Sequence, residues 1–321
     1  MQAVVLAGGY ATRLWPITKH RPKMFLPVGE ETVIDRIFDQ LEADDRIEHV
    51  YVSTNERFAE DFEQHLDEST YEKPRLSVEE TTEEDEKFGV IGALAQLVER
   101  EGIDDDLLVI AGDNLISFQV SEFIDFFDEK RNPVLAAYDV GSLDRAKSYG
   151  LVDIDGDVIV DFQEKPDNPK STLVSIACYA FPQDALLFEE YLNGGNNPDE
   201  PGWFIQWLFS RQEVNAYTFE GAWYDIGTPE SYLEAIAWSL GGENIVADSA
   251  SLDNVTLGEN VLIMEGATLE NVNVDQSVIF PNATIENCDL RECIIDEETH
   301  VANVDLAGAL IGAHTHLTNG H

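Results

Sequence analysis

The sequence predicts an α/β domain with a mostly parallel sheet, followed by a left-handed parallel β-helix. Up to about Leu240, short β-branched runs alternate with amphipathic helical patterns, as in strand–helix–strand units. After Gly241 and Gly242 the pattern changes to a repeat of aliphatic residues with a period of 16. Because 321 residues exceed the usual limit of one hydrophobic core, we expect two domains, residues 1–241 and residues 242–321.

The first part contains strand and helix patterns in alternation. The strand candidates are residues 3–7, 49–53, 107–111 and 134–138. The helical patterns are the apolar face formed by Val33, Ile34, Ile37, Phe38 and Leu41, and residues 92–97 and 123–127. This alternation predicts a Rossmann-like sheet with helices on both faces, whose ligands bind at the carboxyl ends of the strands. The loop of residues 6–13 and the turn at residues 112–114 lie at such ends.

The second part contains four registers at 16-residue spacing. They are Ile263, Ile279, Ile295 and Ile311; Leu269, Ile285, Val301 and Leu317; Val274, Leu290 and Leu306; and Asn271, Asn287, Asn303 and Asn319. Each turn therefore buries three aliphatic residues, one on each side of a triangular coil, which is the pattern of a β-helix. The asparagines suit corners with a left-handed backbone and can stack their amides. Val246, Leu252 and Leu257 predict a first coil of 17 residues.

The charge of the chain limits its partners. It contains 63 acidic and 19 basic residues, for a formal net charge of −44, and the acids are spread along almost the whole length. Such a protein repels polyanions, so we expect neither a nucleic-acid partner nor a membrane partner. A dispersed acidic excess predicts a solvated surface suited to a salt-rich cytoplasm, and hence a halophilic source.

Cysteine usage and hydropathy predict the cellular compartment. The three cysteines, Cys178, Cys288 and Cys293, are odd in number and have no CxxC spacing, so we expect neither disulfides nor zinc. The sequence has no run of 18 apolar residues, and the apolar run at residues 4–7 is too short for a signal peptide. These features predict a cytoplasmic protein.

The first 29 residues invert the charge of the rest of the chain. They contain no acidic residue, where the mean density of acids predicts about six. They do contain Arg13, Lys19, Arg21 and Lys23, next to a hydrophobic strand and a turn with Gly8 and Gly9. A cationic, glycine-rich loop in an anionic protein predicts a site for a highly charged anion, with polyphosphate as the leading candidate.

The chemistry of this loop suits phosphate. Its glycines allow main-chain N–H groups to face phosphate oxygens, Arg13 can donate through its fork to a pyrophosphate, and Lys23 supplies a compact charge. The loop is neither a G-x-G-x-x-G turn nor a Walker A loop. The alternative is an ordinary turn with solvated cations.

The run LAGGYATRLWP at residues 6–16, followed by Arg21-Pro22-Lys23, resembles the sugar-1-phosphate nucleotidylyltransferases. The resemblance is greatest to the glucose-1-phosphate thymidylyltransferase and uridylyltransferase-like branch, although Ala11 stands where that family commonly has glycine. It implies a nucleotidyltransferase that uses Mg²⁺. The implied nucleotide-binding residues are Leu6, Ala7, Gly8, Gly9, Gly89 and Asp113, and the implied catalytic residues are Arg13, Lys23 and Lys165.

The resemblance also implies a metal site formed by Asp113 and Asp225. Asp113 follows an apolar run, and Asp225 lies in the motif WYDIGTP at residues 223–229. Two carboxylates completed by phosphate oxygens and water suit Mg²⁺. From the residues alone, the pattern at Asp113 is more often an ordinary turn, and Asp225 could cap the next helix, a role that Thr228 suits better.

A sugar-phosphate site is implied further along the chain. Gly150 follows Tyr149, and the motif FQEKP at residues 162–166 contains Glu164 and Lys165. By the resemblance, Gly150 and Glu164 contact sugar hydroxyls and Lys165 contacts the sugar phosphate, although a surface ion pair before a turn would give the same pattern. Glu79, Glu80 and residues 88–93 lie where the family reads the nucleobase. Because residues 81–87 form an insertion, only Gly89 is assigned there.

The resemblance implies that a sugar 1-phosphate, with glucose 1-phosphate as the first candidate, attacks the α-phosphate of dTTP or UTP. The products would be a nucleoside-diphosphate sugar and pyrophosphate. Two alternatives stay open, a non-catalytic regulatory paralogue and an acyltransferase that acts through the β-helix, where His300 and His316 are 16 residues apart. The flat sides and open ends of a β-helix favour self-association, so we expect a homo-oligomer.

Overall fold

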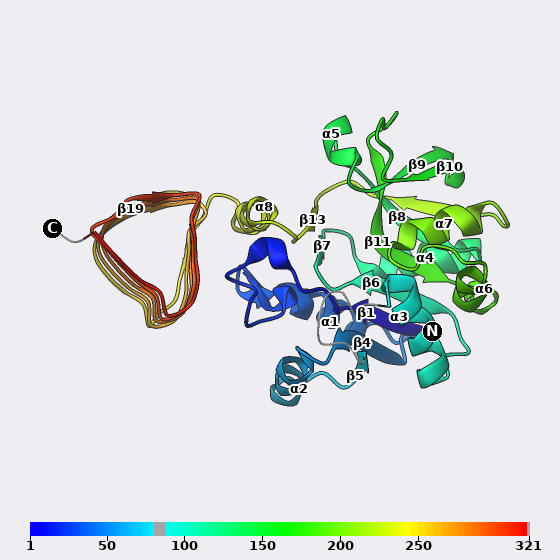
Figure 1. Cartoon of the computed structure of the whole chain (residues 1–321), viewed down its shortest axis with the longest axis horizontal. Helices are drawn as coiled ribbons and strands as arrows, with labels where there is room; N and C mark the ends of the chain where they lie inside the picture. The colour runs from blue at the N-terminus through cyan, green and yellow to red at the C-terminus, as the bar shows by residue number, and fades with distance from the viewer. Residues whose placement is uncertain (80–87, 320–321) are drawn as a thin grey trace. The chain divides into compact units, whose positions relative to one another are not determined.

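The computed structural model describes residues 1–79 and 88–319 (Figure 1). Its contacts divide the chain into two compact units. The sheet unit comprises Met1–Gly9 and Asp35–Trp223, and the β-helix unit comprises Tyr10–Ile34 and Tyr224–His321. The cation-bearing residues 10–34 thus group with the β-helix. The predicted domains, residues 1–241 and 242–321, divide the chain at a different place from these units, which change between Trp223 and Tyr224. The predicted boundary stays a prediction.

A nine-stranded sheet forms the centre of the sheet unit, in the order β5-β4-β1-β6-β11-β8-β12-β10-β9. The strands are β1 (Gln2–Leu6), β4 (His49–Asn55), β5 (Pro74–Glu79), β6 (Leu107–Ala111), β8 (Val134–Asp139), β9 (Gly150–Asp155), β10 (Val158–Glu164), β11 (Leu173–Phe181) and β12 (Asn215–Thr218). From β5 to β6 all pairings are parallel, whereas β11 pairs antiparallel with both β6 and β8. The predicted fold class is confirmed. The strand candidates correspond to β1, β4, β6 and β8.

Within the described residues, seven α-helices belong wholly or mainly to the sheet unit. They are α1 (Val33–Ala43), α2 (Ala59–Glu68), α3 (Val90–Glu101), α4 (Val120–Lys130), α5 (Leu143–Ala146), α6 (Phe188–Asn193) and α7 (Pro201–Phe209). The predicted apolar face of α1 is buried. Residues of α3, α6 and α7, among them Leu94, Phe188 and Phe204, share one buried cluster with Val4 of β1 and Val109 of β6. Apolar periodicity therefore predicted the buried face of α1 and the helical segments in α3 and α4, but it gave no prediction for α6 and α7.

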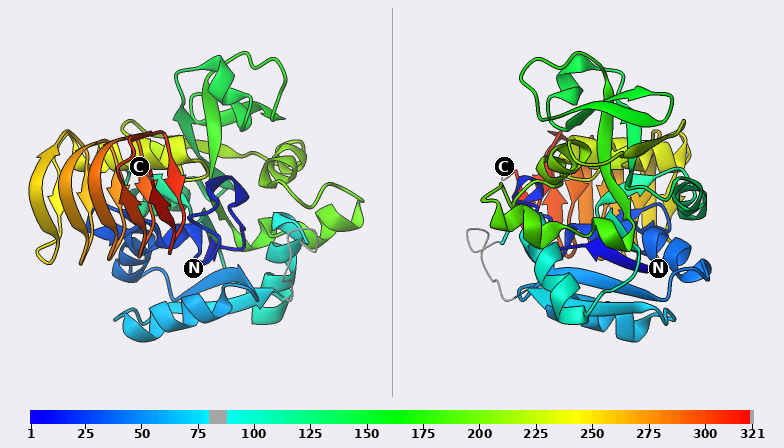
Figure 2. Two further views of the ribbon diagram at one scale, coloured as in Figure 1. Left: turned by 60° about the vertical axis from the view of Figure 1, so that its left-hand side comes forward. Right: turned by 90° about the vertical axis from the view of Figure 1, so that its right-hand side faces the viewer.

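The β-helix consists of two parallel sheets that wind around one apolar interior. One sheet contains β14 (Ile245–Val246), β16 (Leu262–Ile263), β18 (Val278–Ile279), β20 (Ile294–Ile295) and β23 (Leu310–Ile311). The other contains β15 (Ser251–Leu257), β17 (Thr268–Asp275), β19 (Thr284–Arg291), β21 (His300–Ala302) and β24 (His316–Thr318), and β22 (Leu306–Ala307) pairs with β19. Figure 1 looks along this triangular coil, and Figure 2 shows its turns stacked side by side.

The predicted registers of the β-helix are confirmed. Ile263 pairs with Ile279, and Ile279 with Ile295, and all three are buried. The first coil is longer by one residue, since Val246 pairs with Ile263 and Leu257 with Val274. The interior is nevertheless fuller than three residues per turn, because Val261, Ala267 and Val272 are buried in the same cluster beside Ile263, Leu269 and Val274.

Three asparagines of the predicted register, Asn271, Asn287 and Asn303, form a corner ladder together with Asn254, which the register did not include; among the described residues, Asn319 has neither the left-handed φ nor an amide bond of this ladder. Asn254, Asn271, Asn287 and Asn303 have φ angles of 52°, 54°, 53° and 60°, in the left-handed region that asparagine tolerates. Their side-chain amides donate from coil to coil at 2.7, 3.1 and 3.1 Å. The ladder satisfies polar groups at a corner where the strand hydrogen bonds are interrupted.

The β-helix unit also contains a helix and a short hairpin. Helix α8 (Pro229–Leu240) begins with a capping box in which Thr228 Oγ1 accepts from the Ser231 N–H, as the sequence predicted for Thr228. The Tyr232 hydroxyl of α8 donates to the Pro27 carbonyl at 2.7 Å. Pro27 lies in β2 (Pro27–Val28), which pairs with β3 (Glu31–Thr32). Among the described residues, no helix is long and apolar enough to cross a membrane.

Candidate functional site

Residues 6–9 of the sheet unit leave the carboxyl end of β1 between β4 and β6. The Ala7 N–H donates to the Ser53 carbonyl at 2.7 Å, and the Gly112 N–H donates to the Leu6 carbonyl at 2.9 Å. The Asn55 amide donates to the Gly8 carbonyl at 3.0 Å. The backbone of this loop is therefore fixed by its two neighbouring strands, at the sheet edge where α/β ligands bind.

Glu79 lies beside this loop. Its Oε1 accepts from the Ser53 hydroxyl at 3.0 Å, and a Cβ on Gly8 would lie 3.4 Å from that same oxygen. By the resemblance, Glu79 lies where the family reads the nucleobase, with no role assigned to it, and in the structure it lies next to the predicted phosphate loop. Glu80 and the insertion at residues 81–87 lie outside the described residues.

Gly89 caps the amino end of α3 with a φ of 76°. A Cβ at this position would come within 2.5 Å of the Pro198 carbonyl group, and the Ile91 N–H donates to the Pro198 oxygen at 2.9 Å. The glycine is thus required by the approach of the protein's own backbone. Its predicted contact with the nucleobase stays a prediction.

Asp113 follows β6 at the edge of the sheet that also carries residues 6–9. It is half-buried. Its neighbour Gly112 donates a backbone hydrogen bond to Leu6, and Asn114 follows it in the sequence. Asn114 is buried, donates to the Ala177 carbonyl at 3.1 Å and accepts from the Trp223 indole at 3.2 Å. These contacts fix the backbone on both sides of the Asp113 carboxylate.

The carboxylate of Glu164 is enclosed by two glycines. Glu164 pairs with Gly150 across β10 and β9, and a Cβ on Gly150 would lie 2.8 Å from Glu164 Oε2. Gly202, in the first turn of α7, lies against the same oxygen, and the Gln206 side chain accepts from the Glu164 N–H at 3.3 Å. The structure thus brings the predicted residues Gly150 and Glu164 together.

The environment of Glu164 favours its neutral form. Burial, and after it the nearby Glu200 carboxylate, raise the pKa of Glu164 to about 7, and the charge of Lys165 opposes the increase. Lys165 is exposed, has a φ of 42° and forms an ion pair with Glu200. Glu200 and Gly202 were missed from the sequence. The available signal was Pro201, which marks the first turn of a helix.

Arg13 and Asp225 flank Gly227 in the β-helix unit. A Cβ on Gly227 would lie 3.3 Å from an Arg13 guanidinium nitrogen and 3.4 Å from Asp225 Oδ1. The Gly227 N–H donates to the Asp225 carbonyl at 2.9 Å, which makes the turn tight. Arg13 lies in a short 3-10 helix, Thr12–Leu14, and Lys23 begins another, Lys23–Phe25. The other predicted site residues belong to the sheet unit.

Arg21 has a partner that the sequence pattern did not show. Its guanidinium lies 2.7 Å from Asp296 and 3.2 Å from Glu297, and it is placed over the Phe280 ring at 4.8 Å. The acid-free stretch suggested four cations available to an anion. Arg21 is instead neutralised by carboxylates 275 residues further along the chain.

No group of three or more metal-binding side chains is gathered among the residues that the structure describes. A site of the kind predicted would not form such a group, because Mg²⁺ typically uses one or two carboxylates together with phosphate oxygens and water. The carboxylate oxygens of Asp113 and Asp225 are suitable donors for this ion. The assignment of Mg²⁺ to them stays a prediction.

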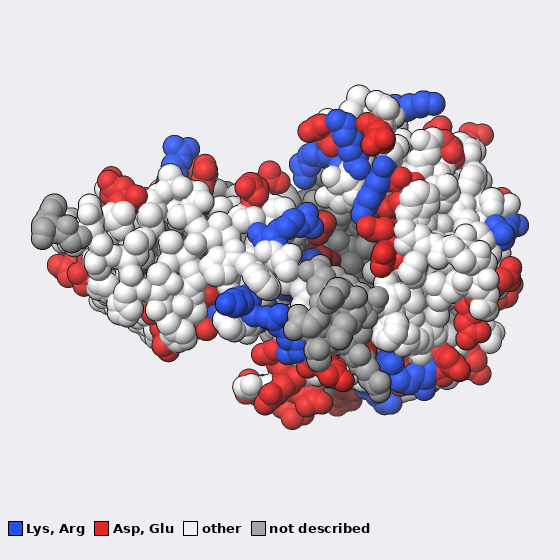
Figure 3. Space-filling view, in the orientation of Figure 1, with Lys and Arg blue, Asp and Glu red and all other residues white. Residues whose placement is uncertain are grey.

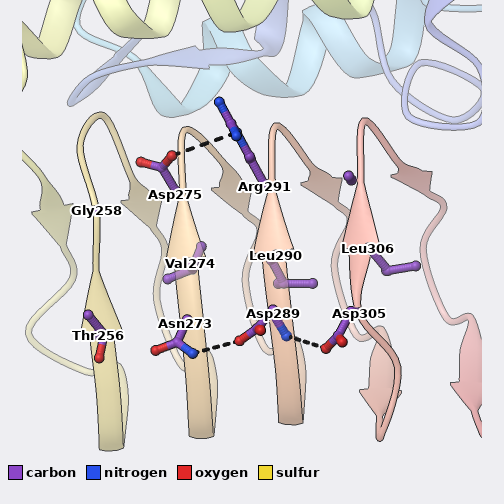
Figure 4. Close-up of a pocket in the computed structure, with 11 residues that line it drawn as sticks. Thr256, Gly258, Asn273, Val274, Asp275, Asp289, Leu290, Arg291, Asp305 and Leu306 are labelled. Atoms are coloured by element: carbon purple, nitrogen blue, oxygen red, sulfur yellow. Dashed lines mark hydrogen bonds and ion pairs between the residues drawn. The ribbon is translucent and has the colours of Figure 1, made fainter.

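The flank of the β-helix carries an open hollow lined by Val274, Leu290 and Leu306 of one predicted register and by none of the predicted site residues (Figure 4). Its rim is bonded from coil to coil, with Asn273 donating to Asp289 at 2.6 Å and Arg291 lying 4.0 Å from Asp275. His300 and His316 pair in register elsewhere on the β-helix, with ring centroids 5.6 Å apart and ring planes tilted by 32°. Acidic side chains are scattered over the visible face of each unit (Figure 3).

Comparison with known families agrees with the fold and the motifs. The nucleotidyl transferase family model matches residues 2–240, and the model of the GlmU-like C-terminal hexapeptide matches residues 235–316. The chain therefore belongs to the nucleotidyl transferase family and carries a hexapeptide-repeat β-helix.

Individual relatives span both parts. The chain is 27% identical over 272 residues to the bifunctional protein GlmU of Methanocaldococcus jannaschii, an alignment that covers 83% of this chain and 61% of that protein. It is 27% identical over 316 residues to a glucose-1-phosphate adenylyltransferase of Mycoplasma mobile, covering 88% and 82%. A solved UDP-glucose pyrophosphorylase in complex with UDP-glucose has a TM-score of 0.62 over 73% of this chain and 96% of that one. Its identity of 23% shows the fold alone.

Proposed function

We propose that the protein transfers a nucleotidyl group from a nucleoside triphosphate to a sugar 1-phosphate and releases pyrophosphate. The observation that carries the proposal is the arrangement at Glu164, whose carboxylate is enclosed by Gly150 and Gly202 and is followed by the cation Lys165. This arrangement lies in the part of the chain that the nucleotidyl transferase family matches. The chain spans only 61% of the length of the M. jannaschii relative. The proposal therefore does not rest on the activity of that protein.

The nucleotide half of the proposal rests on the loop after β1. Main-chain N–H groups of residues 6–9 would face the phosphates of the triphosphate, and Arg13 and Lys23 would neutralise the β- and γ-phosphates. Asp113 and Asp225 would hold Mg²⁺, which would neutralise charge on the α-phosphate and on the leaving pyrophosphate.

The sugar half rests on Glu164 and Lys165. The ionised Glu164 carboxylate would accept hydrogen bonds from sugar hydroxyls, and the missing side chain of Gly150 lets that carboxylate lie against the strand. Lys165 would exchange its partner Glu200 for the sugar phosphate. A phosphate oxygen then attacks the α-phosphorus, the bond from the α-phosphorus to the bridging oxygen breaks, and pyrophosphate leaves with that electron pair. Since the attacking phosphate is already anionic, the reaction needs no general base.

The finer form of the proposal is glucose 1-phosphate with dTTP or UTP. It is supported by the resemblance of residues 6–23 to the thymidylyltransferase and uridylyltransferase-like branch. We also propose a cytoplasmic homo-oligomer that assembles through the β-helix. Neither nucleic acid nor membrane takes part in the proposed reaction.

A substrate panel tests the proposal. The purified protein, in molar KCl with MgCl₂, is incubated with each of the common nucleoside triphosphates and several sugar 1-phosphates, and pyrophosphate release is measured. We expect release that requires both substrates and Mg²⁺. Parallel reactions with acetyl-CoA report acyl transfer through the β-helix. No pyrophosphate with any pair would reject the proposal in favour of a regulatory paralogue.

A further inference from the structure

The last coils of the β-helix bind the segment that carries two of the proposed phosphate-binding cations. Arg21 donates to Asp296 Oδ1 at 2.7 Å and lies 3.2 Å from a Glu297 oxygen, with the ring of Phe280 below it. The Arg21 side chain is 18% exposed and that of Asp296 is 2% exposed. This pair is therefore largely shielded from solvent, unlike most ion pairs on the surface.

Asp296 is held in place by the β-helix itself. Its N–H donates to the Ile311 carbonyl of the next coil at 2.9 Å, and its Oδ1 also accepts from the Glu297 N–H at 2.9 Å. Burial raises the pKa of Asp296 above its usual range, and the charge of Arg21 opposes that increase. A buried carboxylate fixed in this way gives Arg21 little freedom, and loss of either partner would leave the other charge buried and unpaired.

A second contact fixes the same segment a few residues earlier. A Cβ on Gly312 would lie 2.8 Å from Pro16 Cβ, so only glycine allows this coil to approach the segment. The Gly312 carbonyl accepts from Thr299 Oγ1 at 3.1 Å, which ties it to the preceding coil. Pro16 is three residues after Arg13, and Arg21 is two residues before Lys23. The coil contacts therefore lie between the two cations in the sequence, close to each.

We propose that Asp296 is a positioning residue for nucleotide binding. By fixing Arg21, and together with the contact of Gly312 on Pro16, it sets the backbone from which Arg13 and Lys23 reach the triphosphate. The β-helix thus takes part in the activity of each single chain, beyond any role in assembly. This inference rests on the proposed function, because it assigns Asp296 an effect on the affinity for the triphosphate.

A purely structural role for the pair predicts a different result. If Asp296 only stabilised the β-helix unit, its loss would lower the melting temperature and the amount of active protein, with the KM values of the remaining enzyme unchanged. A positioning role predicts a selective change in one KM. The two substrates therefore serve as each other's control.

The test is a double-mutant cycle with Asp296→Asn, Arg21→Gln and the double variant, assayed for pyrophosphate release in molar KCl. Asp253→Asn, the same change at an exposed β-helix residue, is the matched control. We expect each single variant to raise the KM for the triphosphate about tenfold and the double variant to raise it no further, because the two residues act as one unit. The KM for the sugar 1-phosphate should change less than about twofold, and backbone amides of residues 12–26 should exchange hydrogen faster.

Several outcomes would overturn the inference. Unchanged KM values, equal changes for both substrates, or additive effects in the double variant would each reject a positioning role. If Asp296→Asn does not fold, Arg21→Lys is the second variant. It keeps the charge but loses the planar guanidinium that lies over the Phe280 ring and contacts Asp296 and Glu297 through one nitrogen, and it must still raise the triphosphate KM selectively. An unmodified protein that releases no pyrophosphate would reject the proposed function, and this inference with it.

Discussion

The carboxylate of Glu164 lies directly against the α-carbon of Gly202, where any side chain would overlap it. We therefore predict that Gly202→Ala displaces the Glu164 carboxylate and raises the KM for the sugar 1-phosphate. The expected change is about tenfold, equivalent to the loss of one hydrogen bond to a charged group. Steady-state kinetics of pyrophosphate release measure it.

Two controls accompany Gly202→Ala. The KM for the triphosphate should stay within about twofold, because the change acts at the sugar side. The melting temperature should fall little, since alanine favours the helical backbone of α7 and offsets part of the strain. An unchanged sugar KM would show that Glu164 has no contact with the sugar.

The raised pKa of Glu164 predicts a pH dependence of stability. Between its unfolded value of 4.5 and its folded value of about 7, the folded state binds more protons than the unfolded state. The contribution of Glu164 is therefore fully present below pH 4.5 and is lost as the pH rises through about 7. Because many other carboxylates titrate in the same range, the prediction concerns a difference. From pH 5 to pH 8, the unmodified protein should lose more thermal stability than Glu164→Gln. Parallel curves for the two proteins would contradict the raised pKa.

Asp113 should matter for turnover and little for stability. We predict that Asp113→Asn lowers kcat by at least about a hundredfold, because the variant loses one of the two carboxylates that would hold Mg²⁺. Its melting temperature should stay close to that of the unmodified protein, since the side chain is only half-buried. Asp104→Asn, an exposed aspartate in the same unit, is the matched control and should keep full activity. Near-normal turnover of Asp113→Asn would reject the metal assignment.

The β-helix could be predicted almost residue by residue, because its burial pattern repeats along the sequence itself. Ile263 and Ile279 occupy equivalent positions in successive turns, so one period predicts strands, interior and corners together. The sheet unit was predictable as a class, since apolar runs identify strands but not their order. The antiparallel insertion of β11 between β6 and β8 depends on pairings between residues distant in the sequence, such as Cys178 with Ile110.

The candidate site was predictable only where one short segment carries its chemistry. Gly150 and Glu164 followed from motifs, but Gly202 reaches Glu164 from α7, almost 40 residues later. Likewise, the charge pattern around Arg21 suggested an anion-binding cation, and its actual partner, Asp296, lies on a distant coil. Contacts of this kind arise from tertiary packing, which local sequence patterns do not encode.

The asparagine ladder should contribute measurably to the stability of the β-helix. Asn287 has a φ of 53° and takes part in two amide hydrogen bonds, to Asn271 and to Asn303, each of 3.1 Å. We predict that Asn287→Ala costs about 1–2 kcal/mol, from the left-handed backbone and the lost amide bonds. Urea unfolding in molar KCl measures this free energy.

Two comparisons separate the causes. Asn287→Gly keeps the left-handed backbone without strain and should recover part of the loss. Asn273→Ala removes one exposed bond, to Asp289, and should cost less than about 0.5 kcal/mol. Equal effects of Asn287→Ala and Asn273→Ala would show that the corner conformation contributes nothing.

The charge of −44 predicts a requirement for salt. At molar ionic strength the screening length is about 3 Å, so the dispersed carboxylates hardly repel one another, whereas at about 0.01 M it is near 30 Å and the repulsion adds over the surface. Dialysis into dilute buffer should therefore unfold the protein, with loss of its circular dichroism signal, and return of KCl should restore it. NaCl should replace KCl, while sucrose, which does not screen charge, should fail to prevent the unfolding. If the protein stays fully folded in dilute buffer, its acidic surface does not require high salt for stability. That result would remove the argument for a halophilic source.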